Sequence, residues 1–171
     1  FQDHYACAVR LRLKPGSPSM NALSRGVGLL GQMVRFATTR TGLLTIGGAH
    51  LTAFLRSSPD AELPDLQFHC RPATIDVEIK QRTGRMVMER EPGISIATQV
   101  MRPHSMGSIQ IVSADPRDHP AIIPNFLAEP ADQRGTVARL RWARRVMAQP
   151  ALAPYFDHEL APGAAVETDE D

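Results

Sequence analysis

The chain has 171 residues, 43% of them apolar, and a formal net charge of +1. This length supports one domain that buries roughly 70% of the surface of its unfolded chain. A charge so close to zero argues against an extended nucleic-acid surface, and no apolar run approaches the ~20 residues that span a bilayer. We therefore expect one soluble, cytoplasmic domain that neither binds nucleic acid nor spans a membrane.

A strand and a helix are expected first. Residues 5–13 alternate apolar and polar side chains, which indicates a half-buried strand, and the break at Lys14-Pro15-Gly16 ends it. Apolar residues then recur at helical spacing from Leu23 to Ala37. This spacing predicts an amphipathic helix over about residues 22–39.

The helix contains a G-x-G-x-x-G spelling from Gly26 to Gly31. A dinucleotide-binding turn needs a strand before it and a carboxylate about 20 residues after it, and the sequence has neither. We therefore do not interpret this spelling as a dinucleotide-binding motif. The glycines are expected to allow close helix packing, or to loosen a helix that covers an active-site entrance.

Three further strands are predicted, over residues 50–55, 65–73 and 93–101, with a polar loop over residues 56–63. The second of these places Leu66, Phe68 and Cys70 on one face. Its other face carries Gln67, His69 and Arg71. The charged run between Asp76 and Gly93 is expected to be a mobile, solvated excursion, with a functional basic patch as the alternative.

Residues 100–127 predict two short strands joined by a rigid loop. Ile109 and Ile111 alternate with polar positions, Asp115-Pro116 and His119-Pro120 stop the run, and a second run starts at Ile122. Prolines recur at positions 103, 116, 120 and 124 and remove backbone donors. The strands should therefore be short or edge-like.

A final amphipathic helix is predicted over residues 132–148, ended by Gln149-Pro150. Its arginines are expected to form a solvated face or to contact another domain, and nucleic-acid binding is the weaker alternative; they are Arg134, Arg139, Arg141, Arg144 and Arg145. Strands mostly follow strands along the chain. The fold class is therefore α+β, with an antiparallel sheet flanked by helices.

The two cysteines, Cys7 and Cys70, both lie inside apolar strands. No C-x-x-C spacing exists, and small secreted scaffolds carry more cysteines. Two buried thiols are expected, and a disulfide or metal pair is the alternative. No Ser-His-Asp array or metal-ligand spacing is evident either.

Several motifs occur in a fixed order along the chain. They are Pro64-Asp65-Leu66-Gln67-Phe68-His69, Arg102-Pro103-His104-Ser105-Met106-Gly107, Ser113-Ala114-Asp115-Pro116, Pro120, Asn125-Phe126-Leu127, Gln149-Pro150-Ala151-Leu152, Glu159-Leu160-Ala161-Pro162-Gly163 and Thr168-Asp169-Glu170. Over nearly its whole length the chain resembles the glucose-methanol-choline (GMC) oxidoreductases, flavoproteins that oxidise alcohols, and within them the choline dehydrogenase-like branch.

The resemblance implies a substrate domain built on an antiparallel sheet of about six strands. It also implies an FAD-dependent oxidation of a primary alcohol to an aldehyde, with the hydride passing to the flavin. The family's catalytic base and its partner lie in segments after Asp171, so no catalytic residue is expected within this chain. Residues 1–171 are then a substrate-binding domain fragment, with flavin-binding segments missing at both ends, inactive alone and unable to bind FAD tightly.

The resemblance also suggests site residues. The segment from Phe1 to His4 matches the point where the family's chain leaves the flavin domain, which makes Asp3 and His4 cofactor-binding candidates. His50, His69 and Arg102 are the candidates for the substrate pocket. For each histidine, the alternative is a hydrogen-bonded strand residue that faces solvent.

His50 bears on the choice of substrate. Choline-oxidising members of the family tend to show Glu at this position, and a carboxylate can pair with a quaternary ammonium where a histidine cannot. The resemblance therefore implies an enzyme that prefers an uncharged alcohol to choline. If His50 points away from the pocket, the difference has no effect.

The expected partners are a small-molecule alcohol and the flavin domain of the same polypeptide. We expect an exposed apolar patch where the flavin domain docks, on the helix from Gly26 to Ala37 or on the face that carries His50 and His69, and this patch could also join two copies of the chain as a homodimer. A different class of function is a freestanding binding or interaction module that keeps the sheet without flavin chemistry.

Overall fold

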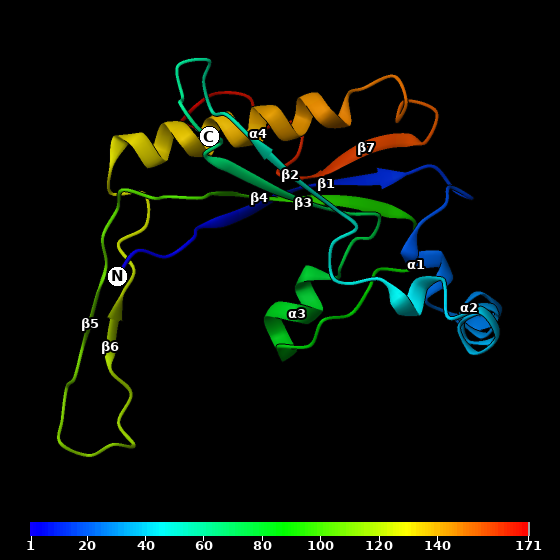
Figure 1. The fold of residues 1–171 in the computed structure, drawn as a ribbon, viewed down its shortest axis with the longest axis horizontal. Helices are drawn as coiled ribbons and strands as arrows, with labels where there is room; N and C mark the ends of the chain where they lie inside the picture. Colours follow the sequence, from blue (N-terminus) through cyan, green and yellow to red (C-terminus); the bar gives the residue numbers. More distant parts are fainter. Residues whose placement is uncertain (171) are drawn as a thin grey trace.

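A computed structural model describes residues 1–170, which fold around a five-stranded antiparallel sheet in the order β2-β3-β4-β1-β7 (Figure 1). The strands are β1 (Ala6–Leu13), β2 (Leu51–Leu55), β3 (Leu66–Arg71), β4 (Gly93–Val100) and β7 (Phe156–Ala161). The predicted α+β class and antiparallel sheet are confirmed. The edge strand β7 was not among the predicted strands.

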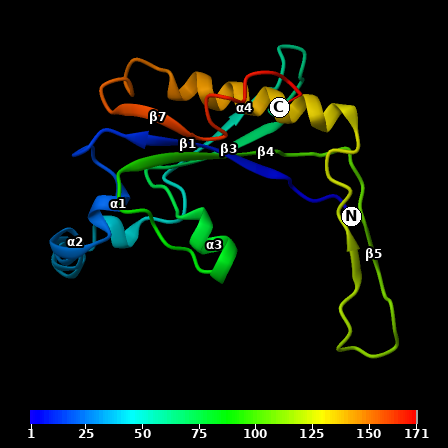
Figure 2. The ribbon, with the colours of Figure 1, turned by 180° about the vertical axis from the view of Figure 1, so that it is seen from behind.

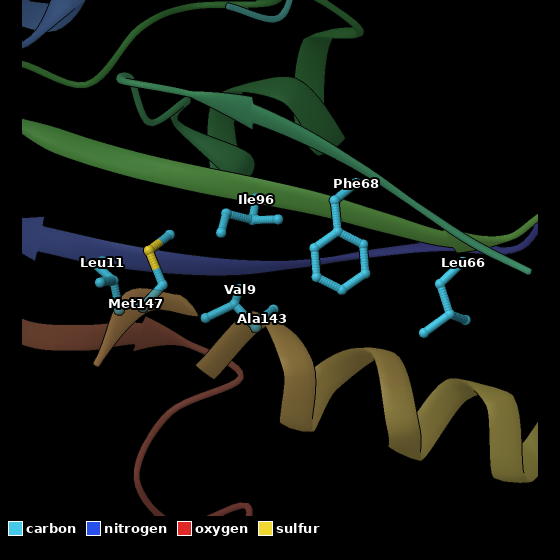
Figure 3. Close-up of a cluster of buried hydrophobic side chains, with 7 residues drawn as sticks. All are labelled: Val9, Leu11, Leu66, Phe68, Ile96, Ala143 and Met147. Carbon is cyan, nitrogen blue, oxygen red and sulfur yellow. The ribbon is translucent and has the colours of Figure 1, made fainter. Parts of the chain in front are cut away.

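Helix α4 (Pro130–Met147) lies across one face of this sheet (Figures 1 and 2). Between the helix and the sheet lies the core, formed by Val9, Leu11, Leu66, Phe68, Ile96, Ala143 and Met147 (Figure 3). The strand members of this cluster occupy the alternate apolar positions of β1, β3 and β4. Period-two alternation thus correctly predicted the buried side of β1 and β3, whereas for β4 only the strand itself was predicted.

The arginines of α4 do not all form the solvated face that was expected. Arg139 is 0% exposed, and its guanidinium donates hydrogen bonds to the carbonyls of Tyr5 and Thr98 and lies over the Tyr5 ring. Arg144 forms an ion pair with Glu159 of β7 at 2.8 Å. Carbonyl groups near the ends of β1 and β4, and a carboxylate on the edge strand, supply these partners. The sequence pattern could not show them.

The predicted helix over residues 22–39 is divided in two. A single turn, α1 (Met20–Leu23), is followed by α2 (Gly26–Thr39) and by the short 3-10 helix η1 (Leu43–Thr45). Gly26 has φ +49°, a conformation that glycine adopts without strain, and it allows the change of direction. α2 has no buried residue.

The glycines of α2 differ in their surroundings. A Cβ on Gly28 would lie 3.0 Å from the carbonyl oxygen of Ala22, so Gly28 does permit close packing of α1 on α2. A Cβ on Gly31 would meet no atom within 4 Å, so the packing role does not extend to this residue. All of residues 26–31 are helical and follow a helical turn, not a strand.

The segment between Asp76 and Gly93 is more ordered than expected. It contains helix α3 (Val77–Thr83), in which the Asp76 side chain accepts a hydrogen bond from the Ile79 N–H and Gly84 ends the helix with φ +70°. Glu89 accepts hydrogen bonds from Arg12 at 2.7 Å and Thr74 at 2.8 Å. The segment is solvated as expected over residues 80–86, but the helix was not predicted; an N-cap aspartate and a C-terminal glycine define it despite the charge run.

Strands β5 (Ser108–Gln110) and β6 (Ala121–Ile123) form a separate two-stranded sheet, as predicted for this Pro-rich region. They belong to a long projection, residues 103–129, which we call the arm; it extends away from the main sheet (Figures 1 and 2). At its base, Gly107 exchanges hydrogen bonds with Phe1 through the amino group and carbonyl of each residue.

A buried carboxylate fastens the arm to α4. Asp132 accepts hydrogen bonds from the N–H of His104 at 2.8 Å, the N–H of Ser105 at 2.7 Å and the Ser105 hydroxyl. Burial raises the pKa of the Asp132 carboxyl, but the hydrogen bonds from Ser105 and His104 outweigh burial and hold that pKa below its ordinary value.

Cys7 and Cys70 are both free and half-buried, and burial raises the pKa of the Cys70 thiol. Both cysteines are thiols, as expected, but they are half-buried and not buried. Among residues 1–170, no cluster of His, Cys, Asp and Glu could hold a metal ion. None of the helices in this range has the length and apolar character needed to cross a bilayer.

Candidate functional site: the open face of the sheet

The face of the sheet opposite α4 carries three rows of side chains that run across the strands. In an antiparallel sheet, residues directly opposite each other share a face and come close enough to interact. The register of β2, β3, β4 and β1 defines the rows. The first is Phe54, Gln67, Gln99 and Ala6; the second is Thr52, His69, Ala97 and Ala8; the third is Arg71, Ser95 and Arg10.

The third row is closed by neighbouring loops. Arg10 donates a hydrogen bond to the carbonyl of Ile75, and Ser95 donates one to the carbonyl of Ala73 at 2.9 Å. Arg71 donates one to the carbonyl of Gly48. The contacts of Arg10 and Ser95 tie the sheet to the loop before α3, and the contact of Arg71 ties it to the loop before β2, so the row has a structural role.

The second row is open and combines one imidazole with a floor of small residues. The Oγ1 of Thr52 lies 3.2 Å from Nδ1 of His69, and this contact orients the ring. Ala97 stands opposite His69, and Ala8 stands opposite Ala97. A flat or small ligand could approach the backbone closely over the two alanines.

The first row carries amides. The amide nitrogen of Gln99 donates a hydrogen bond to the amide oxygen of Gln67 at 2.6 Å, and Phe54 is exposed beside them. Neither open row contains a charged Asp, Glu, Lys or Arg side chain. The face can therefore bind and orient a small polar molecule through hydrogen bonds from an imidazole, a hydroxyl and two amides.

Two predicted pocket residues lie at or beside the open rows. His69 belongs to the second row. His50 precedes β2 by one residue, is exposed, and donates its backbone N–H to the Cys70 carbonyl at 2.9 Å. The alternation of β2, continued by one residue, puts His50 on the same side as Thr52.

The other predicted site residues form a second group at one end of the sheet. Nε2 of His4 lies 3.0 Å from the carbonyl oxygen of Met101, next to Arg102, and Asp3 accepts a hydrogen bond from the N–H of His4 at 2.8 Å. All three are exposed. Arg102 lies five residues beyond Ala97, which stands opposite His69, and five residues correspond to roughly 17 Å along a strand. The structure therefore does not bring Arg102 together with His50 and His69.

Several members of the open face were not singled out from the sequence. Thr52, Ala97 and Gln99 gain their place only through strand register, because each lies on a different strand from at least one of its row neighbours. The alternation of β3 did place Gln67 and His69 together. No local signal named the residues that stand opposite them.

An open groove lies elsewhere, between α1 and α3, with a volume of about 710 Å³. Its lining includes Arg25, Asp76 and Glu89. Arg25 donates to the carbonyl of Met88, Asp76 caps α3, and Glu89 is paired with Arg12. Because these charged groups are engaged in holding the segment together, the groove offers weaker evidence for a binding site than the open face.

Comparison with known proteins gives the same family along the whole chain. The family model described as GMC oxidoreductase matches residues 103–171. An alcohol dehydrogenase (acceptor) of Pseudomonas putida is 32% identical and covers 100% of this chain. An oxygen-dependent choline dehydrogenase of Stenotrophomonas maltophilia is 36% identical and covers 99%.

Solved structures show the same fold at lower identity. A formate oxidase superimposes with a TM-score of 0.77 at 18% identity, covering 99% of this chain and 33% of its own. A pyridoxine 4-oxidase superimposes with a TM-score of 0.67 at 18% identity, covering 97% of this chain and 28% of its own. The chain spans 30% of the length of the alcohol dehydrogenase and 29% of that of the choline dehydrogenase. The resemblance found from the motifs is thus confirmed, and the chain belongs to the GMC oxidoreductase family.

Proposed function

We propose that residues 1–171 are the substrate-binding part of an FAD-dependent alcohol dehydrogenase or oxidase, which oxidises a primary alcohol to an aldehyde. The observation that carries this proposal is the match, along the whole chain, to relatives named for the oxidation of an alcohol and of choline. An uncovered sheet face with neutral polar side chains supports it, because such a face suits the orientation of a small alcohol.

The fit to FAD is partial. The described residues offer no strand-turn-helix for the pyrophosphate, since the G-x-G-x-x-G spelling is helical throughout. The small side chains of Ala8 and Ala97, which stand opposite each other on β1 and β4, suit contact with a flat ring system. We therefore assign the binding of the FAD pyrophosphate to the part of the relatives that this chain does not span. When bound, the flavin supplies the hydride acceptor.

The residues of this chain would orient the alcohol. His69, held by Thr52, can exchange a hydrogen bond with the hydroxyl, and the Gln67–Gln99 pair can do so from the neighbouring row. Asp3 and His4 stay proposed contacts of the flavin and Arg102 a proposed pocket residue, because all three lie exposed at the end of the sheet. The cytoplasmic location and a homodimer through the exposed face also remain predictions.

His69 provides the direct test in the full-length protein. His69→Ala should lower kcat/KM for a primary alcohol by about tenfold or more, which is the loss expected when a positioned hydrogen-bonding group is removed. His119→Ala, in the exposed loop of the arm, is the matched control and should leave kcat/KM unchanged. Equal kcat/KM values for the two variants at equal flavin content would contradict a substrate role for the open face.

His50 tests the substrate class. An uncharged alcohol such as butan-1-ol should be oxidised with a higher kcat/KM than choline, because a histidine provides no fixed negative charge for the ammonium group. His50→Glu should shift the ratio toward choline. A native enzyme that prefers choline, with a ratio unchanged by His50→Ala, would show that His50 does not face the substrate.

The isolated chain provides a third test. We expect no quenching of FAD fluorescence at micromolar concentrations of residues 1–171, because the phosphate grip lies outside this chain. Tight binding of FAD would contradict the division between substrate-binding and flavin-binding parts. Failure of the full-length protein to bind flavin would instead favour a freestanding interaction module.

A further inference from the structure

Helix α2 turns its apolar stripe away from the domain to which it belongs. Val27, Leu30 and Val34 follow one another at helical spacing and are 87%, 60% and 56% exposed. The neighbouring Met33 is exposed as well, and no residue of α2 is buried. An exposed stripe of this kind marks an interaction surface.

The opposite side of α2 holds the helix in place. Gly28 packs against the α1 turn, and the side chain of Gln32 accepts a hydrogen bond from the N–H of Leu43 at 2.9 Å. Phe36 is half-buried on this same side. The half-buried Gln32 and Phe36 therefore face the protein, whereas the aliphatic stripe of Val27, Leu30 and Val34 faces outward.

The charged residues of α2 and of the sequence on either side of it have a single sign. Residues 4–59 contain seven Lys and Arg residues and no Asp or Glu. Because the whole chain carries +1, the remaining residues carry a net charge of −6. Arg35 and Arg40, near the end of α2, are exposed. Helix α2 and its C-cap residue Arg40 therefore combine an aliphatic stripe with cationic side chains and carry no carboxylate of their own.

We propose that α2 lies in the plane of a lipid bilayer surface that contains anionic lipids. A helix with an apolar stripe and cationic flanks inserts its apolar side chains at the headgroup boundary, while its cations attract anionic headgroups. The 14 residues of α2 form a rod of roughly 21 Å, which lies along the surface and does not cross it.

A second copy of the chain is a poorer partner for this surface. A two-fold contact places the same patch on both sides of the interface, so the arginines of one α2 would lie near those of the other. Like charges across an interface oppose association. α2 also lies at the opposite end of the molecule from the arm (Figures 1 and 2). A partner that binds the arm therefore need not reach α2.

Vesicle flotation of the protein in its full natural length tests the proposal. We expect the protein to float with phosphatidylcholine vesicles that contain about a third phosphatidylglycerol, and much less with phosphatidylcholine alone. Replacing Leu30 and Val34 together by Gln should lower the partition coefficient by about tenfold or more, because both side chains lose apolar burial.

Two further variants separate the contributions. Replacing Arg35 and Arg40 by Gln should reduce binding to the anionic vesicles toward the level with phosphatidylcholine alone. Ile111→Gln removes an apolar side chain of the arm that is 90% exposed, and it should leave vesicle binding unchanged. Circular dichroism and thermal denaturation check that each variant is folded.

Three results would overturn the proposal. The first is no preference of the protein for the anionic vesicles. The second is a lipid-free dimer, seen by sedimentation velocity, that the Leu30 and Val34 replacements abolish. The third is a Leu30→Cys variant that a polar maleimide labels much more slowly than Ile111→Cys, because this would show that another part of the protein covers α2.

Discussion

The two long helices, α4 and α2, show how similar sequence patterns can serve opposite purposes. Both carry apolar residues at helical spacing and were predicted as amphipathic helices. α4 buries Ala143 and Met147 against the sheet, whereas α2 buries none of its residues. Helical periodicity identifies an apolar stripe, but it does not say whether the partner of that stripe lies in the same domain.

The helices also differ in where their polar groups lie. In α4, Asp132 and Arg139 are buried and bind the arm and the ends of two strands. In α2, the arginines near the end of the helix are exposed and the aliphatic stripe is uncovered. Substitutions in α4 and the sheet it covers should therefore change stability far more than matched substitutions in α2.

The largest difference is expected for the core beneath α4. Phe68→Ala should lower the free energy of unfolding by about 3–5 kcal/mol, because it leaves a cavity between the sheet and α4. Leu30→Ala in α2 is the control and should change stability by less than about 0.5 kcal/mol. Urea denaturation of both variants measures the contrast. A comparable loss for Leu30→Ala would show that α2 packs within the protein.

The buried arginine of α4 should have the next largest effect. Arg139→Ala should cost about 2–3 kcal/mol, through lost packing and lost hydrogen bonds to the carbonyls of Tyr5 and Thr98. Arg139→Met should cost less than about 1 kcal/mol, because it refills the space without a buried charge. Equal unfolding midpoints of the two variants would show that the hydrogen bonds outweigh the packing.

The clamp between α4 and the arm should have a smaller effect that depends on pH. Asp132→Asn should cost about 1–2 kcal/mol at pH 7, because an amide cannot replace a carboxylate that accepts three hydrogen bonds. The pKa of Asp132 lies below its ordinary value in the folded protein, so its stabilisation is present above about pH 4 and is lost as the pH falls through the folded pKa.

Urea midpoints at pH 7 and pH 3 measure this dependence. The difference in urea midpoint between the native protein and Asp132→Asn should be smaller at pH 3 than at pH 7. Asp60→Asn changes an exposed loop carboxylate and should leave the free energy of unfolding at pH 7 within about 0.5 kcal/mol of the native value. A gap that is constant with pH would mean that the Asp132 charge does not stabilise the fold.

The smallest expected effects on stability lie in α2 and differ between its two glycines Gly28 and Gly31. Gly31→Ala should raise the free energy of unfolding by about 0.4–1 kcal/mol, because the added methyl group meets no atom and the unfolded chain loses freedom. Gly28→Ala should give no such gain, because its Cβ would press on the Ala22 carbonyl oxygen. Thermal denaturation resolves the pair, and identical shifts would contradict the packing of α1 on α2.

Local sequence patterns were enough for much of the fold and for the family. Alternation within β1 and β3 identified the core side of each strand, and the prolines of the arm predicted short strands, which have three residues each in the structure. The motifs, in their order along the chain, were sufficient to identify the GMC oxidoreductases. These features depend on neighbouring residues or on short motifs, which a sequence displays directly.

The candidate site was only partly accessible from the sequence. Alternation placed Gln67 and His69 on one face, but it could not show that Thr52 and Gln99 stand beside them or that Arg102 lies far along the strand. Helix α3 was obscured by its charge run, although Asp76 and Gly84 mark its two ends. Pairing between strands depends on contacts across dozens of residues, so no local pattern reports it.

The sequence by itself determined the apolar stripes, the strand faces, the family and the charge asymmetry between residues 4–59 and the rest of the chain. Only the tertiary structure decided that Arg139 is buried, that α2 turns its stripe outward and that Thr52 and Gln99 lie on the same face of the sheet as His69. The physical reason is that periodicity is a property of a segment, whereas burial depends on which distant segments pack against it.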